Sequence, residues 1–325
     1  MEAVRNLWIG FFVLFCVGVM TLSGGVGSFN FLQDKKVKKP SKGESQEFYN
    51  ATFYSFGLEN EPFIVNSLKV LMPTGGKEIL LTQPFGSIES SGEVMKYQGS
   101  SGEVFLNNQE VRLSGNVVLT KPDLRVTGDQ MILNQRSKEA YMYENVRTFL
   151  STRAGNKVRV RSKNARVDDT LGLINYDQNV SGRILFKDKK FSPEILFSSE
   201  SLTYFIKDSK MTLEKNVNLK KENIHLKSRS GRVLVDKNQK NISYFKLIDD
   251  VKFKEVFIAS NGQKIERTGI SQVLEGFGLE RKIVMSGYPK IKQLDDLIQG
   301  NKIILKEESE LVEIINTNSK FRFKE

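Results

Sequence analysis

Residues 111–133 read VRLSGNVVLTKPDLRVTGDQMIL. Apolar and polar residues alternate on both sides of the Gly115-Asn116 pair, and a Lys-Pro-Asp sequence marks a turn further on. Such alternation predicts two half-buried β-strands joined by that turn. Glycine and asparagine tolerate left-handed backbone, so their place inside a strand indicates a bulge. The stretch therefore predicts a strand that bends at residues 115–116.

The same corner recurs along the chain. Copies are YENVRTF, YDQNVSGRI, LEKNVNL, LIDDVKF and VMSGYPKI, and LLTQPFG is a weaker copy. A second four-residue pattern follows the corners. It consists of an apolar residue, a residue of any type, a small residue and a polar residue, as in VTGD (126–129), VRSK (160–163) and IASN (258–261). Repetition of this kind predicts stacked units that bury their apolar faces jointly. The valine or proline of each corner stands at position 84, 117, 146, 180, 217, 251 or 289, in steps of 29 to 38 residues.

Composition narrows the possible functions. The 325 residues carry a net charge of +11 and a pI of about 9.4, which permits anionic partners without selecting one. Cys16 is the one cysteine, so the chain has no intramolecular disulfide. His225 is the one histidine, which excludes a multi-histidine metal site and most histidine-based catalysis. We expect no cofactor, no metal site and no catalytic residues.

The N-terminus predicts export. Residues 7–22, LWIGFFVLFCVGVMTL, are strongly apolar, and no charge occurs between Leu7 and Gln33. We expect residues 1–32 to form a membrane anchor, with a cleaved signal peptide as the alternative. Residues 33–45 are polar and predict a linker. With either segment, the rest of the chain is predicted to be exported.

From residue 46 onward the chain predicts strands and turns. Helical periodicity is weak and is confined to ISQVLEGFGLERK (270–282), which contains two glycines. Alternation places Val111, Leu113, Val117 and Leu119 on one face of their strand. We therefore expect a long antiparallel sheet that folds over itself. Its inner face either packs as a core or holds an elongated apolar ligand.

The outer face is basic in places. In KVRVRSK (157–163), the lysines and arginines share one side of the strand, whereas Val158 and Val160 share the other. A solvated face explains such charges. Contact with phosphates of an anionic ligand or membrane is the functional alternative.

These motifs resemble a known family. GNVVLTKPDLRVTGDQMIL is similar to the repeat of the OstA-like proteins of lipopolysaccharide export, the Lpt system. An anchor followed by FYNATFYSFGLENEPFIVNSLKVLM (48–72), ILLTQP (79–84) and GEVFLNNQEVRLSGNVVL (102–119) resembles the membrane-anchored C component in its order of parts. Residues 46–152 thus resemble an LptC-like jellyroll, and residues 153–325 resemble the soluble LptA-like bridge component. The chain is longer than either component alone.

The resemblance implies a fold and a function. The fold would be an elongated antiparallel β-jellyroll, folded like a taco, and the protein would be no enzyme. It would bind lipopolysaccharide acyl chains in an apolar β-groove and pass the lipid from an inner-membrane Lpt ABC transporter to a further OstA-like bridge or an outer-membrane Lpt component. No nucleic acid would take part. The expected groove residues are Val111, Leu113, Val117, Leu119, Val126, Val146, Val158, Val160, Val217, Leu219, Leu226, Val251, Phe253, Ile291 and Ile298.

The last residues predict a partner-docking edge. In IINTNSKFRFKE (314–325), Phe321 and Phe323 share one face of a strand pattern, and basic residues share the other. A final strand leaves backbone groups unpaired, and these can accept a strand from another chain. The same charges can instead protect the edge from pairing.

Two other function classes remain as alternatives. An exported, membrane-anchored β-solenoid scaffold without lipid cargo predicts more uniform repeats than these. A polysaccharide-processing enzyme predicts a cluster of polar residues that converge from several repeats. The paired carboxylates at 168–169, 249–250 and 295–296 fit turns and a corner better than glycosidase chemistry.

Overall fold

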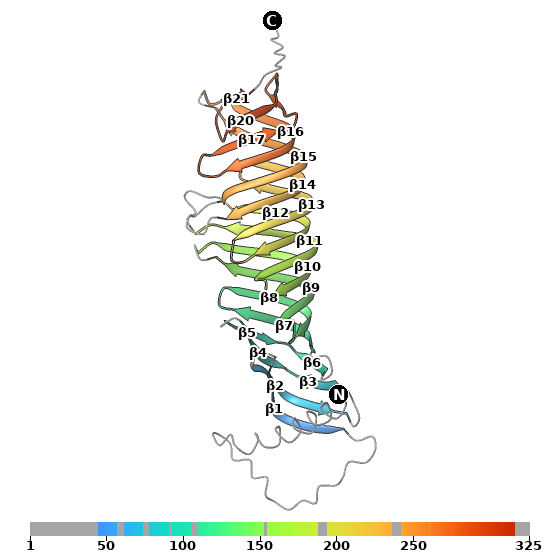
Figure 1. Cartoon of the computed structure of the whole chain (residues 1–325). Helices are drawn as coiled ribbons and strands as arrows, with labels where there is room; N and C mark the ends of the chain where they lie inside the picture. The colour runs from blue at the N-terminus through green and yellow to red at the C-terminus, as the bar shows by residue number, and fades with distance from the viewer. Residues whose placement is uncertain are drawn as a thin grey trace, which may run out of the picture.

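The protein is an elongated stack of β-strands (Figure 1). The structure is a computed structural model, and it describes residues 45–56, 62–73, 78–90, 93–105, 110–152, 155–187, 194–235, 242–259 and 261–315. The first strands are β1 (Gln46–Phe56), β2 (Pro62–Met72), β3 (Glu78–Thr82), β4 (Phe85–Ser90), β5 (Glu93–Gln98), β6 (Ser101–Phe105), β7 (Glu110–Lys121), β8 (Leu124–Asn134), β9 (Glu139–Ser151) and β10 (Lys157–Asp168). The remaining strands are β11 (Leu173–Leu185), β12 (Ile195–Phe205), β13 (Lys210–Lys221), β14 (Ile224–Val235), β15 (Ile242–Ile258), β16 (Lys264–Phe277), β17 (Lys282–Ser286), β18 (Lys290–Gln293), β19 (Asp296–Gln299), β20 (Lys302–Lys306) and β21 (Val312–Ile315).

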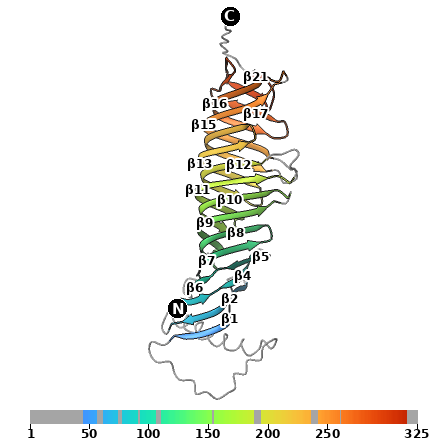
Figure 2. The ribbon, with the colours of Figure 1, turned by 180° about the vertical axis from the view of Figure 1, so that it is seen from behind.

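All the strands belong to one antiparallel sheet. Each long strand from β7 to β16 pairs with the strand before it and the strand after it. Near both ends, shorter strands come in consecutive pairs that together replace one long strand, as β17 and β18 do beside β16. β1 lies at one end of the stack and β21 at the other (Figures 1 and 2). The all-β, antiparallel fold class is confirmed.

A crease runs across the long strands at the predicted corners. Gly115 and Asn116 both have positive φ, at 75° and 48°. The two residues oppose one residue of β8, because the register shifts between Ser114 and Val117. Equivalent left-handed pairs occur at 144–145, 178–179, 215–216, 249–250 and 287–288. The predicted bulge is confirmed at each of these corners, and at the weaker copy only Gln83 has positive φ.

The strands between the bulged ones have small residues where they cross the crease. Ser162, Ser199 and Ser228 are buried there, and each donates its hydroxyl to the carbonyl oxygen two residues further on, at 2.7–2.8 Å. These hydroxyls satisfy carbonyls that the bend takes out of the regular ladder. On β16 the same bond comes from Ser271. The expected copy IASN does not fall at the crease, because Ile258 ends β15.

The crease divides the sheet into two leaves. Strand halves on one side pair only with strand halves on the same side. Leaf A comprises the strand residues within 110–114, 130–143, 164–177, 201–214, 230–248, 273–286 and 302–315. Leaf B comprises those within 117–128, 146–162, 180–199, 217–228, 251–271 and 290–299. The hairpin turns form a margin along each leaf, opposite the crease.

The described part of the chain contains no helix. The weak helical candidate at 270–282 forms no helix, because residues 270–277 belong to β16. None of the described residues form a helix that could cross a membrane. The expected anchor at 1–32 and nearly all of the linker at 33–45 lie outside the described residues. The ladder continues past the expected boundary at 152/153, since β9 pairs with β10.

Candidate functional site

The inner faces of the two leaves carry the predicted groove residues. Val117, Leu119 and Val126 have no exposed surface, and Leu219, the most exposed of the buried set, is 6% exposed. Ile298 is partly buried and packs against the others. These side chains are therefore buried in the structure, and binding of lipid to them stays a prediction. The fully buried members are Val111, Leu113, Val117, Leu119, Val126, Val146, Val158, Val160, Val217, Leu219, Leu226, Val251, Phe253 and Ile291.

One apolar cluster follows the length of the stack. It begins with Phe63 and Val65 on β2 and extends to Ile303 and Leu305 on β20, with members on both leaves. Alternation sends these side chains between the leaves and the charged ones outward. The two leaves pack directly on each other, so the space between them is closed in this structure.

A few polar groups interrupt this apolar interior. The hydroxyls of Thr148 and Tyr204 are buried and make no hydrogen bond of regular geometry within the described residues, although Tyr176 lies near Thr148 and Ser209 lies near Tyr204. Burial raises the pKa of Tyr204 to about 12. The hydroxyl of Tyr97 instead donates to the carbonyl oxygen of Ile64 at 2.8 Å.

The margins of the leaves are tied together in the middle of the stack. Lys121, where β7 ends on leaf B, forms an ion pair with Asp169, which follows β10 on leaf A. Its ammonium group also lies 2.8 Å from a carboxylate oxygen of Glu93. Burial lowers the pKa of Lys121, but hydrogen bonds to the two carboxylates outweigh burial and raise it overall. This ion pair joins the two margins, and so it closes the opening between the leaves (the mouth) on the side opposite the crease.

A second closure lies near the C-terminal end. Glu255 on β15 and Arg267 on β16 face inward on leaf B, and both side chains are 0% exposed. Arg267 donates to the carbonyl oxygen of Ser309, and the backbone N–H of Glu308 donates to Glu255 at 3.1 Å. The turn after β20 belongs to leaf A, so these bonds cross the mouth. Lys221 adds a bond to Glu307 at 2.7 Å.

Burial dominates the electrostatics of this closure. It raises the pKa of the Glu255 carboxyl, although the Glu308 amide and Arg267 act against the shift. Sequence reasoning missed the pair. The alternation along β15 could have identified Glu255 as an inward residue, because it follows Val251 and Phe253 at steps of two along the same strand.

Apolar side chains are exposed at both ends of the stack. Tyr49 on β1 is 63% exposed, and Phe85 on β4 is 54% exposed. At the other end, Leu311 is 71% exposed and Leu297 on β19 is 51% exposed. Within the described residues β1 pairs only with β2, and β21 pairs only with β20. The outer edges of β1 and β21 are therefore unpaired within the described part of the chain. Phe321 and Phe323 of the expected docking edge lie outside the described residues.

The paired carboxylates occupy turns and the crease. Asp168 accepts a bond from the backbone N–H of Leu171 at 2.9 Å, which is a turn-capping contact. Asp249 and Asp250 form a left-handed pair at the crease. Among the described residues, no group of three or more His, Cys, Asp or Glu side chains could hold a metal ion.

The chain is similar to known transport proteins over its C-terminal part. Residues 197–311 match the family described as LptA/(LptD N-terminal domain) LPS transport protein. No curated protein matches the chain. A solved structure that matches is the crystal structure of LptH, the LptA homologous periplasmic component of the lipopolysaccharide transport device from Pseudomonas aeruginosa. That match has 14% identity and a TM-score of 0.30, and it covers 49% of this chain and 82% of the other. The family match thus spans residues 197–311, from β12 to the turn before β21, and makes this part of the chain similar to LptA and to the N-terminal domain of LptD.

Proposed function

We propose that the protein is a bridge that carries lipopolysaccharide across the periplasm, with the acyl chains between leaf A and leaf B. The observation that carries this proposal is the single apolar cluster that follows the stack from Phe63 to Leu305. The family match of residues 197–311 names lipopolysaccharide transport and supports the same cargo. Burial of acyl chains against such a face is favourable by about 0.8 kcal/mol per CH₂ group.

Loading requires the leaves to separate. The crease is the natural hinge, because its bulged residues interrupt the regular ladder between the two halves of each strand. The margins would open where the Lys121–Asp169 pair and the Arg267–Ser309 bond now join them. Acyl chains would then replace the contacts between the inner faces, and the headgroup would remain outside the mouth.

The ends of the stack suit a relay. Free edges with exposed apolar residues at β1 and β21 can each accept a strand from a neighbouring OstA-like protein. Such pairing would extend the apolar face from one protein into the next. We propose the inner-membrane Lpt transporter as the partner at the β1 end, with an anchor at residues 1–32. A further bridge or an outer-membrane Lpt component would dock at the other end. We propose no catalytic step.

Site-specific photo-crosslinking tests the cargo. A photoreactive residue at Val117 lies on the inner face and should form an adduct with lipopolysaccharide in cells. The same residue at Arg161, which points outward from leaf B, should form far less acyl-chain adduct. If position 117 gives no glycolipid adduct and native mass spectrometry finds a lipid-free protein, the scaffold without cargo becomes the better explanation.

A further inference from the structure

The outer face of leaf B is strongly basic. From β8 to β18, outward positions are held by Arg125, Arg147, Arg161, Lys220, Lys227 and Lys252, all of them exposed. On the described strands of leaf B up to β18, the outward carboxylate is Glu266, which lies 2.9 Å from Lys254. Glu194, directly before β12, lies 3.2 Å from Arg183. Among the described strand residues, cations therefore predominate on the outer face of leaf B.

Like charges stand directly opposite each other on this face. The strand register pairs Arg147 with Arg161 and Arg159 with Arg183. It also pairs Lys227 with Lys252. Like charges at directly opposed positions destabilise a sheet, so the free protein carries a cost that a bound anion would remove.

Leaf A differs in the mixture of its charges. There, Lys246 stands opposite Glu275, with 3.5 Å between the ammonium nitrogen and a carboxylate oxygen. Arg166 pairs with Glu139 and Arg112 with Glu110. Like charges also stand opposite each other on leaf A, as Arg232 and Lys246 do, but carboxylates lie among its cations. Outward carboxylates are rarer on the described strands of leaf B.

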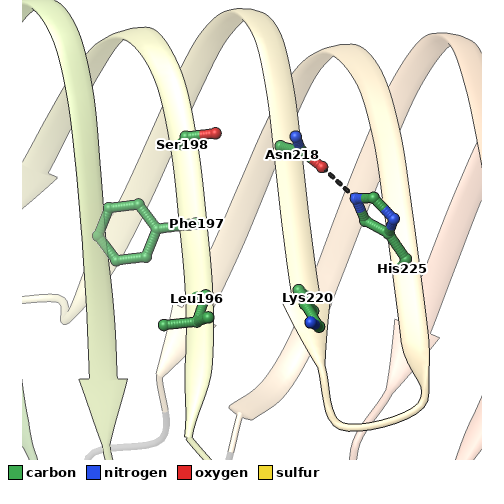
Figure 3. Close-up of a pocket in the computed structure, with 6 residues that line it drawn as sticks. All are labelled: Leu196, Phe197, Ser198, Asn218, Lys220 and His225. Carbon is green, nitrogen blue, oxygen red and sulfur yellow. Dashed lines mark hydrogen bonds between the residues drawn. The ribbon is translucent and has the colours of Figure 1, made fainter.

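A shallow depression lies within the basic face. It has a volume of about 170 Å³ and is lined by Leu196, Phe197, Ser198, Asn218, Lys220 and His225 (Figure 3). These residues come from the adjacent strands β12, β13 and β14, and a ring nitrogen of His225 lies 2.5 Å from the side-chain oxygen of Asn218. The lining combines neutral hydrogen-bonding groups, a cation and an apolar side chain. That combination suits the hydroxyls, the acidic group and the apolar face of a sugar ring.

An aromatic side chain supports the same chemistry further along the leaf. Phe149 is 42% exposed, and the guanidinium carbon of Arg159 lies 5.7 Å from its ring centroid. Exposed aromatic rings give a stacking surface for a sugar, and arginine gives bidentate contacts to a phosphate or a carboxylate.

We propose that the outer face of leaf B binds the anionic saccharide headgroup of the glycolipid whose acyl chains lie between the leaves. This inference rests on the proposed function. The basic rows run from strand to strand along the stack, parallel to the inner apolar cluster. Lys220 adjoins Lys221, which contacts Glu307 across the mouth. A headgroup that emerges between the two margins therefore lies about three residues from the basic face. At roughly 3.3 Å per strand residue this is about 10 Å.

The geometry favours this ligand over a flat lipid surface. A sheet of this length accumulates twist, so a planar membrane would meet only part of the basic rows. A flexible saccharide can follow the twist. An acidic polypeptide is the remaining alternative, and the experiment below separates it.

Matched charge variants of the full-length protein test the proposal. One variant combines Lys220→Gln, Lys227→Gln and Lys252→Gln on leaf B. The control combines Arg232→Gln, Lys302→Gln and Lys306→Gln, which are exposed on leaf A and change the net charge equally. The probe is the deacylated saccharide of lipopolysaccharide, and binding is measured by calorimetry at low and high salt. We expect the leaf B variant to bind at least about tenfold more weakly and to lose most of the salt dependence. We expect the control variant to bind like the unchanged protein.

The possible outcomes are distinct. Equal loss in both variants, or no loss in either, overturns the proposal, because binding would then follow net charge or lie elsewhere. Tighter binding of polyglutamate or of phosphatidylglycerol vesicles than of the saccharide, lost only in the leaf B variant, also overturns it. The leaf B variant should unfold no earlier than the unchanged protein, because it relieves repulsion. Crosslinking from Val117 reports on acyl-chain capture separately. A negative crosslinking result would contradict the proposed function without contradicting saccharide binding to leaf B.

Discussion

Arg267 and Glu255 stand directly opposite each other on β16 and β15, and neither side chain reaches solvent. A guanidinium nitrogen lies 3.3 Å from a carboxylate oxygen, and the guanidinium carbon lies 4.9 Å from the ring centroid of Phe257. Arg267 also donates to the side chain of Gln293 at 2.8 Å and to Ser309 on the opposite margin. One buried cation thus joins three strands of leaf B to the edge of leaf A.

Removal of Arg267 should be costly. Arg267→Met leaves the carboxylate of Glu255 buried without its counter-charge, and we expect a loss of about 3–5 kcal/mol in the free energy of unfolding. The double variant Glu255→Leu with Arg267→Met replaces the pair with apolar side chains and should recover most of that loss. Urea unfolding measures both values. A double variant as unstable as the single one would show that the bonds to Ser309 and Gln293, rather than the ion pair, hold this end together.

The crease should be sensitive to side-chain shape. Asn216 has a φ of 53°, where β-branched residues are strained. We expect Asn216→Val to destabilise the protein by about 1–2 kcal/mol relative to Asn216→Gly. The control is Glu214→Val, two residues earlier on the same strand, where the side chain is exposed, φ is not positive and the substitution suits a strand. Equal effects at both positions in chemical unfolding would argue against a strained crease.

The crease and the inner face could be predicted from the sequence because both are local patterns. Gly115-Asn116 and its copies carry the bend in two adjacent residues, and alternation then assigns Val111 through Leu119 to one face. The corners with Glu144, Gln178 and Lys215 follow only from the repeat, since these residue types do not favour left-handed backbone.

The closures and the charged face could not be predicted in the same way. The bonds from Arg267 to Ser309 and from Lys121 to Asp169 join residues 42 and 48 positions apart. They depend on which margins meet when the leaves fold together. The basic face likewise depends on register, because only the pairing of neighbouring strands places Arg159 opposite Arg183. The sequence shows the charges of residues 157–163 but not their neighbours.

A carboxylate on the inner face should block cargo. Leu219→Glu or Val117→Glu places an ionisable group among side chains that are almost fully buried, where a charged form without a partner is strongly disfavoured. We expect loss of lipopolysaccharide adducts at inner crosslinking positions, together with lower thermal stability. The control Arg161→Ala removes an outward side chain and should leave acyl-chain capture nearly intact. Normal adduct formation in Leu219→Glu would place the acyl chains elsewhere.

His225 should make both stability and saccharide binding depend on pH. Burial, followed by Lys227, Lys220 and Lys254, lowers its pKa below the ordinary value of 6.5. Because the unfolded chain then binds the proton more readily, His225 contributes stability above pH 6.5 that is lost as the pH falls through and below that value.

An anion beside Lys220 would reverse the effect on His225. It would favour the imidazolium, so the saccharide should bind more tightly at about pH 5.5 than at about pH 7.5. His225→Gln keeps a hydrogen-bonding side chain beside Asn218 and should flatten both pH profiles. Calorimetry and thermal unfolding at the two pH values measure the change. Unchanged profiles in His225→Gln would assign the dependence to other groups.

The C-terminal edge should connect the protein to its next partner. β21 ends the described part of leaf A, and Val312 packs against the core while Ile315 is partly exposed. Residues 316–325 follow directly and carry the alternating Phe321 and Phe323. We expect deletion of 316–325 to abolish docking to the next Lpt component, because the chain would lose the alternating sequence that predicts a strand for pairing with the partner. Lipopolysaccharide binding should persist, since the inner cluster from Phe63 to Leu305 is untouched. Co-purification with the partner and crosslinking from Val117 measure the two properties in the same preparation. A truncated protein that docks with unchanged affinity would place the docking edge at another strand, and one that loses lipid as well would show that the segment belongs to the groove.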